Sequence, residues 1–264
     1  MLHLIGLGLN DVNDISLRAL ETIKNCEFIY LENYTAIFNS SIQEMEELFG
    51  KKVILADRDL VEKGTEIIDN AKKNDVAFLV VGDPMSATTH SDLILRAVKE
   101  KVAYNIIHNI SILTAVGSTG LQLYKFGKTP SIVFPDGDWL PSTPYNVLKF
   151  NKSNNLHTLL LLDIKVKEPS KEDIRKNIDK YKEPKYMTIK EAIEILLKLS
   201  DDPKVFSKNT MCVGVARLGS EDQVIKYGTA GQLMSEDFGA PLHSLIVPGS
   251  LHFMEEEFLE MFKK

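Results

Sequence analysis

Cysteine is scarce in this sequence of 264 residues, which contains Cys26 and Cys212 and no other. The two lie far apart and form no Cys-x-x-Cys pair, so we expect neither a disulfide scaffold nor a zinc site built on cysteines. Both are interpreted as reduced thiols in or near the core. His3, His157 and His252 show no metal-ligand spacing with one another and are interpreted as structural residues. No metal is predicted.

Long hydrophobic runs are also missing, although 44% of the residues are hydrophobic. No run approaches the roughly 18 apolar residues that span a bilayer, so no membrane partner is expected. The chain starts with the strand-like run 2–5 and has no basic segment before it, which argues against a signal peptide. We therefore predict a cytoplasmic protein.

An excess of positive charge is the third absence. The formal net charge is −6, which argues against a protein that holds a nucleic-acid backbone over a broad surface. The most basic segment, 165–185, carries acidic residues between its lysines, a mixture typical of a solvated helix and linker. No nucleic-acid partner is predicted.

Short apolar runs alternate with segments of helical periodicity, the pattern of βαβ units. Strands are predicted at 2–6, 28–31, 53–55, 76–81, 104–108, 131–134, 157–162, 210–216, 223–228 and 244–247. Helices are predicted at 15–24, 41–49, 60–73, 91–101, 112–124, 187–200 and 252–262. The first half favours a mostly parallel sheet, and short turns such as 219–222 favour antiparallel hairpins in the second. We predict an α/β fold with two α/β domains and mixed sheets, at 1–110 and 111–264.

The junction at 82–90 follows a buried apolar strand and reads Gly-Asp-Pro-Met-Ser-Ala-Thr-Thr-His. Open α/β sheets bind small molecules beyond the carboxyl ends of such strands, so Asp83 is a candidate ligand-binding carboxylate. The alternative is a capped helix start, with Thr88 or Thr89 as the N-cap residue. Local sequence leaves the two interpretations equal.

A Gly-x-Gly turn follows the first strand, at Gly6 and Gly8. Asp11 stands where the third glycine of a dinucleotide fingerprint belongs, which disfavours a nicotinamide or flavin dinucleotide. A tight connection explains the turn equally well, with Asn13, Asp14 or Ser16 capping the next helix.

The segment 106–112 repeats the theme of a strand and a turn. Ser111 is placed to cap the following helix, whose free amides suit a ligand. His108 is interpreted as a strand-end histidine with satisfied hydrogen bonds, not as a base. The chain has no phosphate loop, no Ser-His-Asp spacing and no carboxylate pair that demands acid–base chemistry.

The loop 134–144 contains three prolines and the only tryptophan of the chain. It is predicted to be an ordered surface loop. Trp139 is interpreted as an anchor packed on the nearest sheet edge, with a partner contact as the alternative.

Six segments together resemble the diphthine synthase family, and the likeness covers nearly the whole chain. They are 5–9, 82–90, 109–112, 161–165, 216–220 and 241–249. The family belongs to the tetrapyrrole-methylase-like superfamily, so the resemblance implies two α/β domains with S-adenosylmethionine bound in a cleft between them. It also implies a homodimer.

The resemblance implies that the protein methylates a 3-amino-3-carboxypropyl-histidine of translation elongation factor 2. The stretches 139–145 and 162–168 are similar to the eukaryotic branch, which methylates the amine three times and the carboxylate once. The polar loop 135–138 departs from the family pattern and bears on how the substrate docks.

Carried over position by position, the family's cofactor contacts are Leu9, Asp83, Ser86, Ser111, Ile112, Leu162, Leu218 and His243. No general base can be named, and neither a metal nor any further cofactor is implied. Two rivals stay open: a methylase of the same superfamily acting on a tetrapyrrole or ribosomal RNA, and a non-catalytic adaptor of elongation factor 2.

Overall fold

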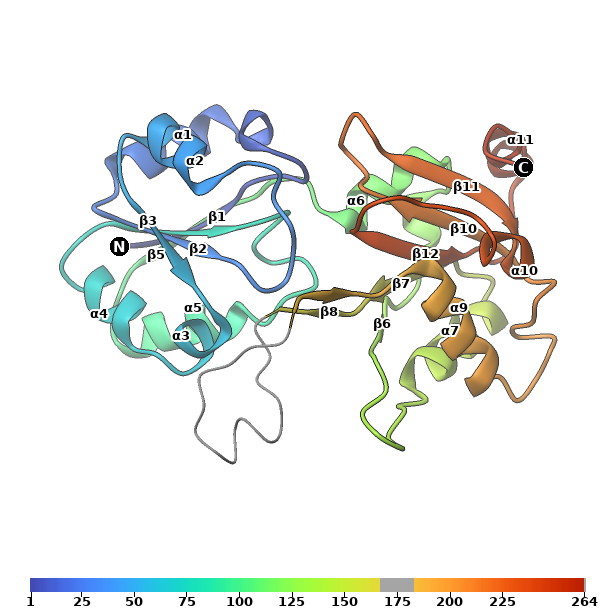
Figure 1. Cartoon of the computed structure of the whole chain (residues 1–264). Coiled ribbons are helices and arrows are strands. Elements are labelled where there is room, and N and C mark those ends of the chain that lie inside the picture. The colour runs from blue at the N-terminus through green and yellow to red at the C-terminus, as the bar shows by residue number, and fades with distance from the viewer. Residues whose placement is uncertain (167–182, 264) are drawn as a thin grey trace. The chain divides into compact units, whose positions relative to one another are not determined.

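A computed structural model describes residues 1–166 and 183–263, and these form two compact units (Figure 1). The first unit is Met1–Leu113 and the second is Thr114–Lys264. The boundary between the two units follows Leu113. It is close to position 110, where the first domain predicted from the sequence ends. The basic segment 165–185 and the stretch 162–168 fall in part on residues 167–182, outside the described residues.

The first unit contains a fully parallel sheet of five strands in the order β3-β2-β4-β1-β5. Its strands are β1 (Leu2–Gly6), β2 (Phe28–Glu32), β3 (Val53–Ala56), β4 (Val76–Val80) and β5 (Tyr104–Ile107). All five residues of β4 are buried, as expected of a strand covered on both faces. Because the strands are parallel, their carboxyl ends meet at one edge of the sheet.

Helices cover both faces of this sheet, as Figure 1 shows. They are α1 (Leu17–Asn25), α2 (Ile42–Phe49), α3 (Arg58–Glu62), α4 (Glu66–Ala71) and α5 (Ser91–Lys99), with a 3-10 turn, η1, at Val12–Asp14. One core contains Ile23 and Met45 from α1 and α2, and the other contains Ile67 and Leu93 from α4 and α5. The two-sided core fixes each strand's position against its neighbours.

The second unit contains a mixed sheet in the order β11-β10-β12-β7-β6. Its strands are β6 (Ser131–Ile132), β7 (Thr158–Leu162), β10 (Met211–Ala216), β11 (Val224–Thr229) and β12 (His243–Val247). The pairs are antiparallel except β6 with β7. A two-stranded ribbon joins β8 (Ile164–Lys165) to β9 (Lys185–Tyr186). The predicted change from a parallel to a mixed sheet is confirmed.

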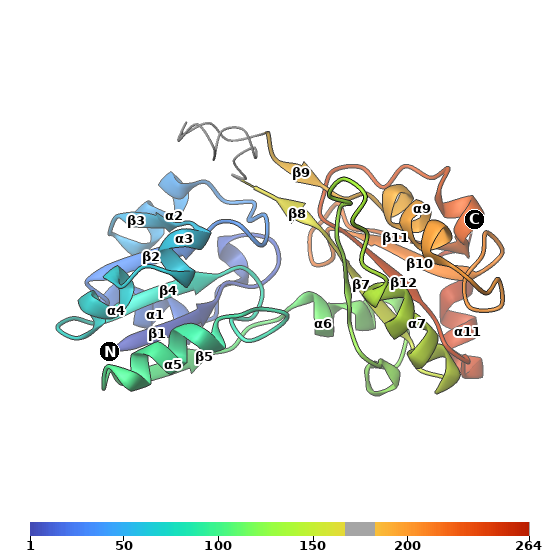
Figure 2. The same cartoon turned by 90° about the horizontal axis from the view of Figure 1, so that it is seen from below.

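The helices of the second unit are short at its start and longer afterwards. They are α6 (Ile112–Ala115), the 3-10 turns η2 (Val116–Thr119) and η3 (Leu123–Lys125), α7 (Thr143–Ser153), α9 (Ile189–Leu199), α10 (Ala230–Leu233) and α11 (Phe253–Glu260). α7 and α9 contribute Leu148 and Leu196 to one core with β7, β10 and β12, and Figure 2 shows both helices beside these strands.

Three predictions about helices are wrong. The helix predicted at 60–73 is two helices, α3 and α4, with Gly64 between them. The helix predicted at 112–124 breaks into α6, η2 and η3, because Gly120 adopts a positive φ of 82°. Neither Thr88 nor Thr89 caps α5: His90 is its N-cap residue, without a side-chain cap bond.

Ser16 caps α1 through its hydroxyl, which accepts a hydrogen bond from the amide of Ala19, so one of the three cap candidates is confirmed. Three elements are present that the sequence pattern does not predict: α7, α10 and the β8-β9 ribbon. Trp139 ends a turn in which it exchanges backbone hydrogen bonds of 3.1 Å with Asp136. Its side chain is 61% exposed, so its interpretation as a packed anchor is wrong.

Candidate functional site

The carboxyl ends of β1, β4 and β5 form one continuous edge, because β4 and β5 flank β1. The turns beyond β1 and β4 are joined by the amide of Gly82, which donates to the carbonyl of Gly8 at 2.7 Å. Gly82 has a φ of 81°, and a Cβ built on it would lie 3.7 Å from the Cβ of Ser111. The fold thus gathers five of the predicted cofactor residues at this edge: Leu9, Asp83, Ser86, Ser111 and Ile112.

The Gly-x-Gly turn is filled by the protein itself. Asp14 accepts the amide hydrogens of Leu9 at 3.0 Å and Asn10 at 2.8 Å on its Oδ2 atom. A Cβ on Gly8 would come within 2.4 Å of the Cβ of Asp14, so glycine is needed to admit this carboxylate. The amides that would hold a pyrophosphate in a dinucleotide site are therefore occupied.

Asp83 is 8% exposed, and its carboxylate accepts four hydrogen bonds. Oδ1 accepts from the Met85 amide at 2.9 Å and the Ser86 hydroxyl at 3.4 Å. Oδ2 accepts from His108 Nδ1 at 2.8 Å and the Asn109 amide at 3.2 Å. Burial raises the pKa of Asp83, but the bonds from Met85, His108 and Asn109 outweigh it and leave the pKa below its ordinary value. Asp83 is therefore an ionised carboxylate that shapes the loop.

Asn109 connects the three loops of this edge. Its side-chain amide donates to the carbonyl of Gly6 at 3.1 Å and to that of Asp14 at 3.0 Å. Its backbone amide donates to Asp83. The positions of the five predicted residues therefore depend on two polar side chains, Asp14 and Asn109, that were not assigned a site role from the sequence.

His90 closes the same loop from the opposite side. Its Nδ1 lies 3.1 Å from the Pro84 carbonyl, and its ring packs edge-on against Phe78. The loop predicted as a ligand elbow and the helix start are thus parts of one structure, although the N-cap residue differs from the predicted ones.

In the second unit, Leu162, Leu218 and His243 are neighbours at one edge of the mixed sheet. Ala216 pairs with His243 in the register of β10 and β12, and the amide of Arg217 donates to the carbonyl of Leu242 at 3.0 Å. Ser244 pairs with Leu161, which brings His243 next to Leu162. All three predicted residues are at least nine-tenths buried.

His243 has one satisfied and one free ring nitrogen. Nε2 lies 3.2 Å from the carbonyl of Gly239 and 3.1 Å from that of Ala240. Nδ1 is one of the few buried side-chain atoms without a hydrogen-bond partner among the described residues. Burial lowers the pKa of this histidine, so it stays neutral at pH 7. A buried polar atom without a partner is suited to a bound polar group.

Arg217 holds the loop that precedes His243. It is a non-glycine residue with a φ of 49°. Its guanidinium donates to the carbonyls of Phe238 at 2.9 Å and of Ala240, and to the Asp222 carboxylate at 2.6 Å. The guanidinium therefore joins the β10–β11 turn to the loop under His243.

Each of the two groups, taken by itself, offers contacts of a kind that S-adenosylmethionine requires. Its adenine ring is flat and weakly polar, and buried leucines beside a histidine with a free nitrogen suit such a ring. At the edge of the first unit, the partly buried hydroxyl of Ser86 is a polar group of the kind that ribose or an amino-acid tail contacts.

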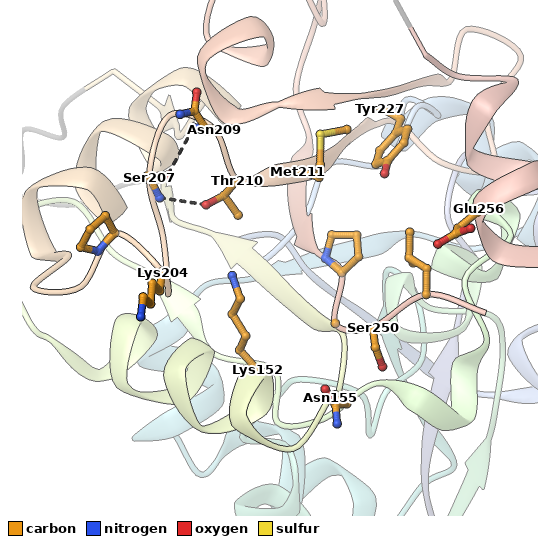
Figure 3. Close-up of a pocket in the computed structure, with 14 residues that line it drawn as sticks. Lys152, Asn155, Lys204, Ser207, Asn209, Thr210, Met211, Tyr227, Ser250 and Glu256 are labelled. Carbon is orange, nitrogen blue, oxygen red and sulfur yellow. Dashed lines mark hydrogen bonds between the residues drawn. The ribbon is translucent and has the colours of Figure 1, made fainter. Parts of the chain in front are cut away.

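A separate hollow of about 710 Å³ lies in the second unit (Figure 3). Its lining includes Met211 at the start of β10 and Pro248 just after β12, so it is at the opposite end of these strands from Leu218 and His243. Figure 3 shows Lys152 reaching from α7 toward the hollow, with the Ser207 amide donating to the Thr210 hydroxyl at the rim, 2.8 Å away. None of the eight predicted cofactor residues lines it.

The remaining candidates from the sequence have structural surroundings. Cys26 and Cys212 are free and buried, as predicted, and burial raises the pKa of Cys26 to about 11. His157 is buried against Glu255 and His252 caps α11. Across residues 1–166 and 183–263, no group of three or more potential metal ligands is found. No helix in this part of the chain is long and apolar enough to cross a membrane.

Comparison with known proteins decides the family. The sequence profile of the tetrapyrrole (corrin/porphyrin) methylases matches residues 1–234. The chain belongs to this methylase family. Its relatives include the diphthine methyl ester synthase of Homo sapiens, 47% identical over 99% of this chain and 95% of the relative. That of Schizosaccharomyces pombe is 48% identical over 99% and 94%.

A crystal structure of a diphthine synthase agrees in fold as well as sequence. It is 41% identical, has a TM-score of 0.86, and covers 99% of this chain and 95% of its own. The resemblance to the diphthine synthases within the methylase family is confirmed, and so is the predicted α/β fold.

Proposed function

We propose that the protein is an S-adenosylmethionine-dependent methyltransferase of diphthamide biosynthesis. It methylates the 3-amino-3-carboxypropyl-histidine of translation elongation factor 2. Three methyl groups go to the amine and one to the carboxylate, which gives diphthine methyl ester. The observation that carries the proposal is full-length identity of nearly one half to diphthine methyl ester synthases.

The cofactor residues of the proposal are the eight named from the sequence. Five are Leu9, Asp83, Ser86, Ser111 and Ile112 at the edge of the first unit, and three are Leu162, Leu218 and His243 in the second. Support comes from the way each group is gathered at strand ends, and from the free, buried Nδ1 of His243. Asp83 contributes by fixing the loop, because its four acceptor positions are already taken.

Methyl transfer requires mainly that the protein positions the two reactants and excludes water. When bound, S-adenosylmethionine supplies an electrophilic methyl carbon on a sulfonium. Buried apolar residues such as Leu162 and Leu218 help to keep water from the bound cofactor, and a dry site favours a reaction in which charge is dispersed. The loops 82–90 and 108–112 are joined by the hydrogen bonds of Asp83, and loops fixed in this way can align the reactants, which contributes much of the acceleration.

The test is incubation with elongation factor 2 that carries the aminocarboxypropyl histidine, with labelled S-adenosylmethionine, followed by mass spectrometry. A gain of four methyl groups is the expected result. A gain of three would make the enzyme stop at the trimethylated amine, and no gain would overturn the proposal. A Ser111→Trp variant serves as a control, since a bulky side chain beside Gly82 should abolish cofactor binding in calorimetry.

Two rivals make different predictions in the same assay. A non-catalytic adaptor would bind elongation factor 2 without binding S-adenosylmethionine. A superfamily member with another acceptor would bind the cofactor but leave elongation factor 2 unlabelled. The net charge of −6 disfavours ribosomal RNA as that acceptor.

We also propose a cytoplasmic homodimer, without nucleic-acid or membrane partners. Support for self-association comes from α11, whose outer side exposes Phe253, Met254 and Phe258 by 66%, 55% and 41%. Adjacent exposed apolar side chains of this size are more typical of an interface than of a free surface.

A further inference from the structure

His108 stands at the carboxyl end of β5, directly before Asn109 and three residues before Ser111. Its side chain is 66% exposed, whereas that of its partner Asp83 is 9% exposed. The Nδ1 edge of the imidazole is therefore held by Asp83, and the rest of the ring is open to a ligand at the edge of the first unit.

The Asp83 carboxylate determines which nitrogen of His108 carries the proton. Asp83 is ionised and can only accept hydrogen bonds, so the His108 Nδ1 atom 2.8 Å away must be the donor. In neutral His108 the lone pair is then on Nε2. That atom has no hydrogen bond to any described residue. The carboxylate itself has no lone pair left, because Met85, Ser86 and Asn109 occupy the other three positions.

The proposed reaction needs a base for some of its steps only. A peptide α-amino group has a pKa of about 8, and a neighbouring carboxylate raises the pKa of an amine further, so at pH 7 the amine is protonated and cannot attack a methyl group. It must lose a proton before each of the three amine methylations. A carboxylate is already deprotonated at pH 7, so ester formation requires no base.

We propose that Nε2 of His108 is the general base for the amine methylations, an inference that rests on the function proposed above. Nε2 takes one proton from the ammonium, and the freed nitrogen lone pair forms the N–C bond to the methyl group. The C–S bond breaks with its electron pair on sulfur. Imidazolium His108 then releases the proton to solvent, and the cycle repeats until the nitrogen has three methyl groups and no proton.

The ionisable groups of the loops beside His108 include Asp83, Asp14 and His90. Asp83 contacts it from the loop after β4. Asp14, on η1, directs its carboxylate to the amides of Leu9 and Asn10, and His90 packs against Phe78 on the helix side of the loop. The direct partner of the imidazole is thus a carboxylate that stabilises the imidazolium formed in the reaction.

The test compares the two kinds of methylation in one His108→Gln variant. Wild-type product, hydrolysed under mild alkali, gives elongation factor 2 with a trimethylated amine and a free carboxylate. We expect the variant to esterify this substrate at a rate close to that of the wild type. On the unmethylated substrate, its amine methylation should fall about 100-fold or more at pH 7. The residual amine rate should rise about tenfold per pH unit as solvent deprotonates the amine.

Two further measurements separate a base from a structural residue. Calorimetry should give the same S-adenosylmethionine affinity for variant and wild type within about twofold. Nitrogen-15 NMR of the wild type should report His108 with its proton on Nδ1. His3→Gln, a change at the amino end of β1 in the same sheet, is the matched control and should leave both rates unchanged.

Each other outcome overturns the inference. Equal loss of amine and ester methylation would make His108 a structural residue, and unchanged amine methylation would exclude it as the base. A wild-type protein that leaves the unmethylated substrate unchanged would overturn the proposed function itself, and the inference with it.

Discussion

Two histidine–carboxylate pairs in this protein have almost the same local chemistry and opposite exposure. Asp83 holds His108 at the edge of the first unit, and Glu255 holds His157 inside the second. Each carboxylate accepts four hydrogen bonds. Those on Glu255 come from the amides of Gln122 and His252 at 2.9 and 2.8 Å, from Lys125 at 2.9 Å and from His157 at 2.9 Å.

The pairs differ in the second ring nitrogen. His157 Nδ1 accepts the Gly249 amide at 3.0 Å, so its proton is on Nε2 and points to Glu255. Both nitrogens are used, and the side chain is fully buried. In His108 the proton is on Nδ1 and Nε2 is free. A carboxylate beside a histidine is therefore not enough to indicate a base, because the decisive feature is an accessible nitrogen that retains its lone pair.

The largest effect is expected on stability, when the buried pair of His157 and Glu255 is disrupted. Glu255→Gln removes the charge that partners Lys125 and places an NH2 group opposite hydrogen-bond donors. Breaking a buried ion pair costs about 3 to 5 kcal/mol, so we expect a loss of this size in the free energy of unfolding. Urea denaturation followed by circular dichroism measures it. The amine-to-ester ratio of the remaining folded protein should not change.

The pH dependence of stability provides the control for this variant. Burial raises the pKa of Glu255, but the hydrogen bonds from Lys125, Gln122, His252 and His157 lower it to about 2, below the ordinary 4.5. Its stabilising contribution is therefore present above pH 4.5 and lost as the pH falls toward 2. Glu255→Gln should remove this part of the stability curve. Glu256→Gln, an exposed neighbour on α11, should shift stability by less than about 0.5 kcal/mol.

The next effect is in the exposed pair, where activity should change more than stability. In Asp83→Asn, either amide orientation places an NH2 group against donors: the Met85 amide, or the Asn109 amide with His108 Nδ1. We expect amine methylation to fall about 10- to 100-fold, with a smaller fall in ester formation, because His108 loses its fixed tautomer.

Asp14→Asn is the matched control for this change. Its amide oxygen can still accept from both Leu9 and Asn10, so the ratio of amine to ester methylation should stay that of the wild type. An Asp83→Asn protein with a wild-type ratio would separate Asp83 from proton transfer and weaken the distinction between the two pairs.

The sequence predicts the scaffold of the exposed pair better than its contacts. A continuous apolar run such as 76–80 predicts a buried parallel strand, and the loops beyond parallel strands must share an edge. The same pattern cannot predict that the side chain of Asn109 donates to the carbonyl of Gly6, 103 residues away in the chain. Nor can it predict that the carboxylate of Asp14 fills the glycine turn. His108 was interpreted as a satisfied histidine for the same reason: only the structure distinguishes the bonded nitrogen from the free one.

The wrong helix predictions also arise from tertiary contacts. Periodicity at 112–124 suits a helix, but Gly120 packs against Phe258 from α11, and a Cβ there would lie 2.3 Å from that ring. α7 was missed because Thr143 and Pro144 resemble the end of a loop, although proline is favourable in the first turn of a helix. At 112–124 the local pattern does not contain the neighbour that decides the structure, whereas the start of α7 carries a local signal, the proline, that a loop interpretation overlooks.

A third buried carboxylate, Glu32, can be compared with Asp83 and Glu255. The smallest effect on stability is expected here. Glu32 ends β2 and is 3% exposed. Its Oε2 accepts the Thr35 hydroxyl at 2.6 Å, but its Oε1 has no partner among the described residues. Burial raises the pKa of Glu32, and the bonds from Thr35 and the Tyr34 amide offset this in part. Unlike Asp83 and Glu255, its charge is incompletely compensated.

Neutralising this charge should therefore stabilise the protein at neutral pH. A carboxylate with a raised folded-state pKa favours folding below its ordinary pKa of 4.5 and loses that contribution as the pH rises. We expect Glu32→Gln to increase the free energy of unfolding at pH 7, and to increase it less near pH 4. Glu21→Gln on the exposed side of α1 should have no such pH-dependent effect. A Glu32→Gln protein destabilised equally at both pH values would mean that Oε1 has a partner when folded, and that Glu32 is satisfied as fully as Asp83 and Glu255.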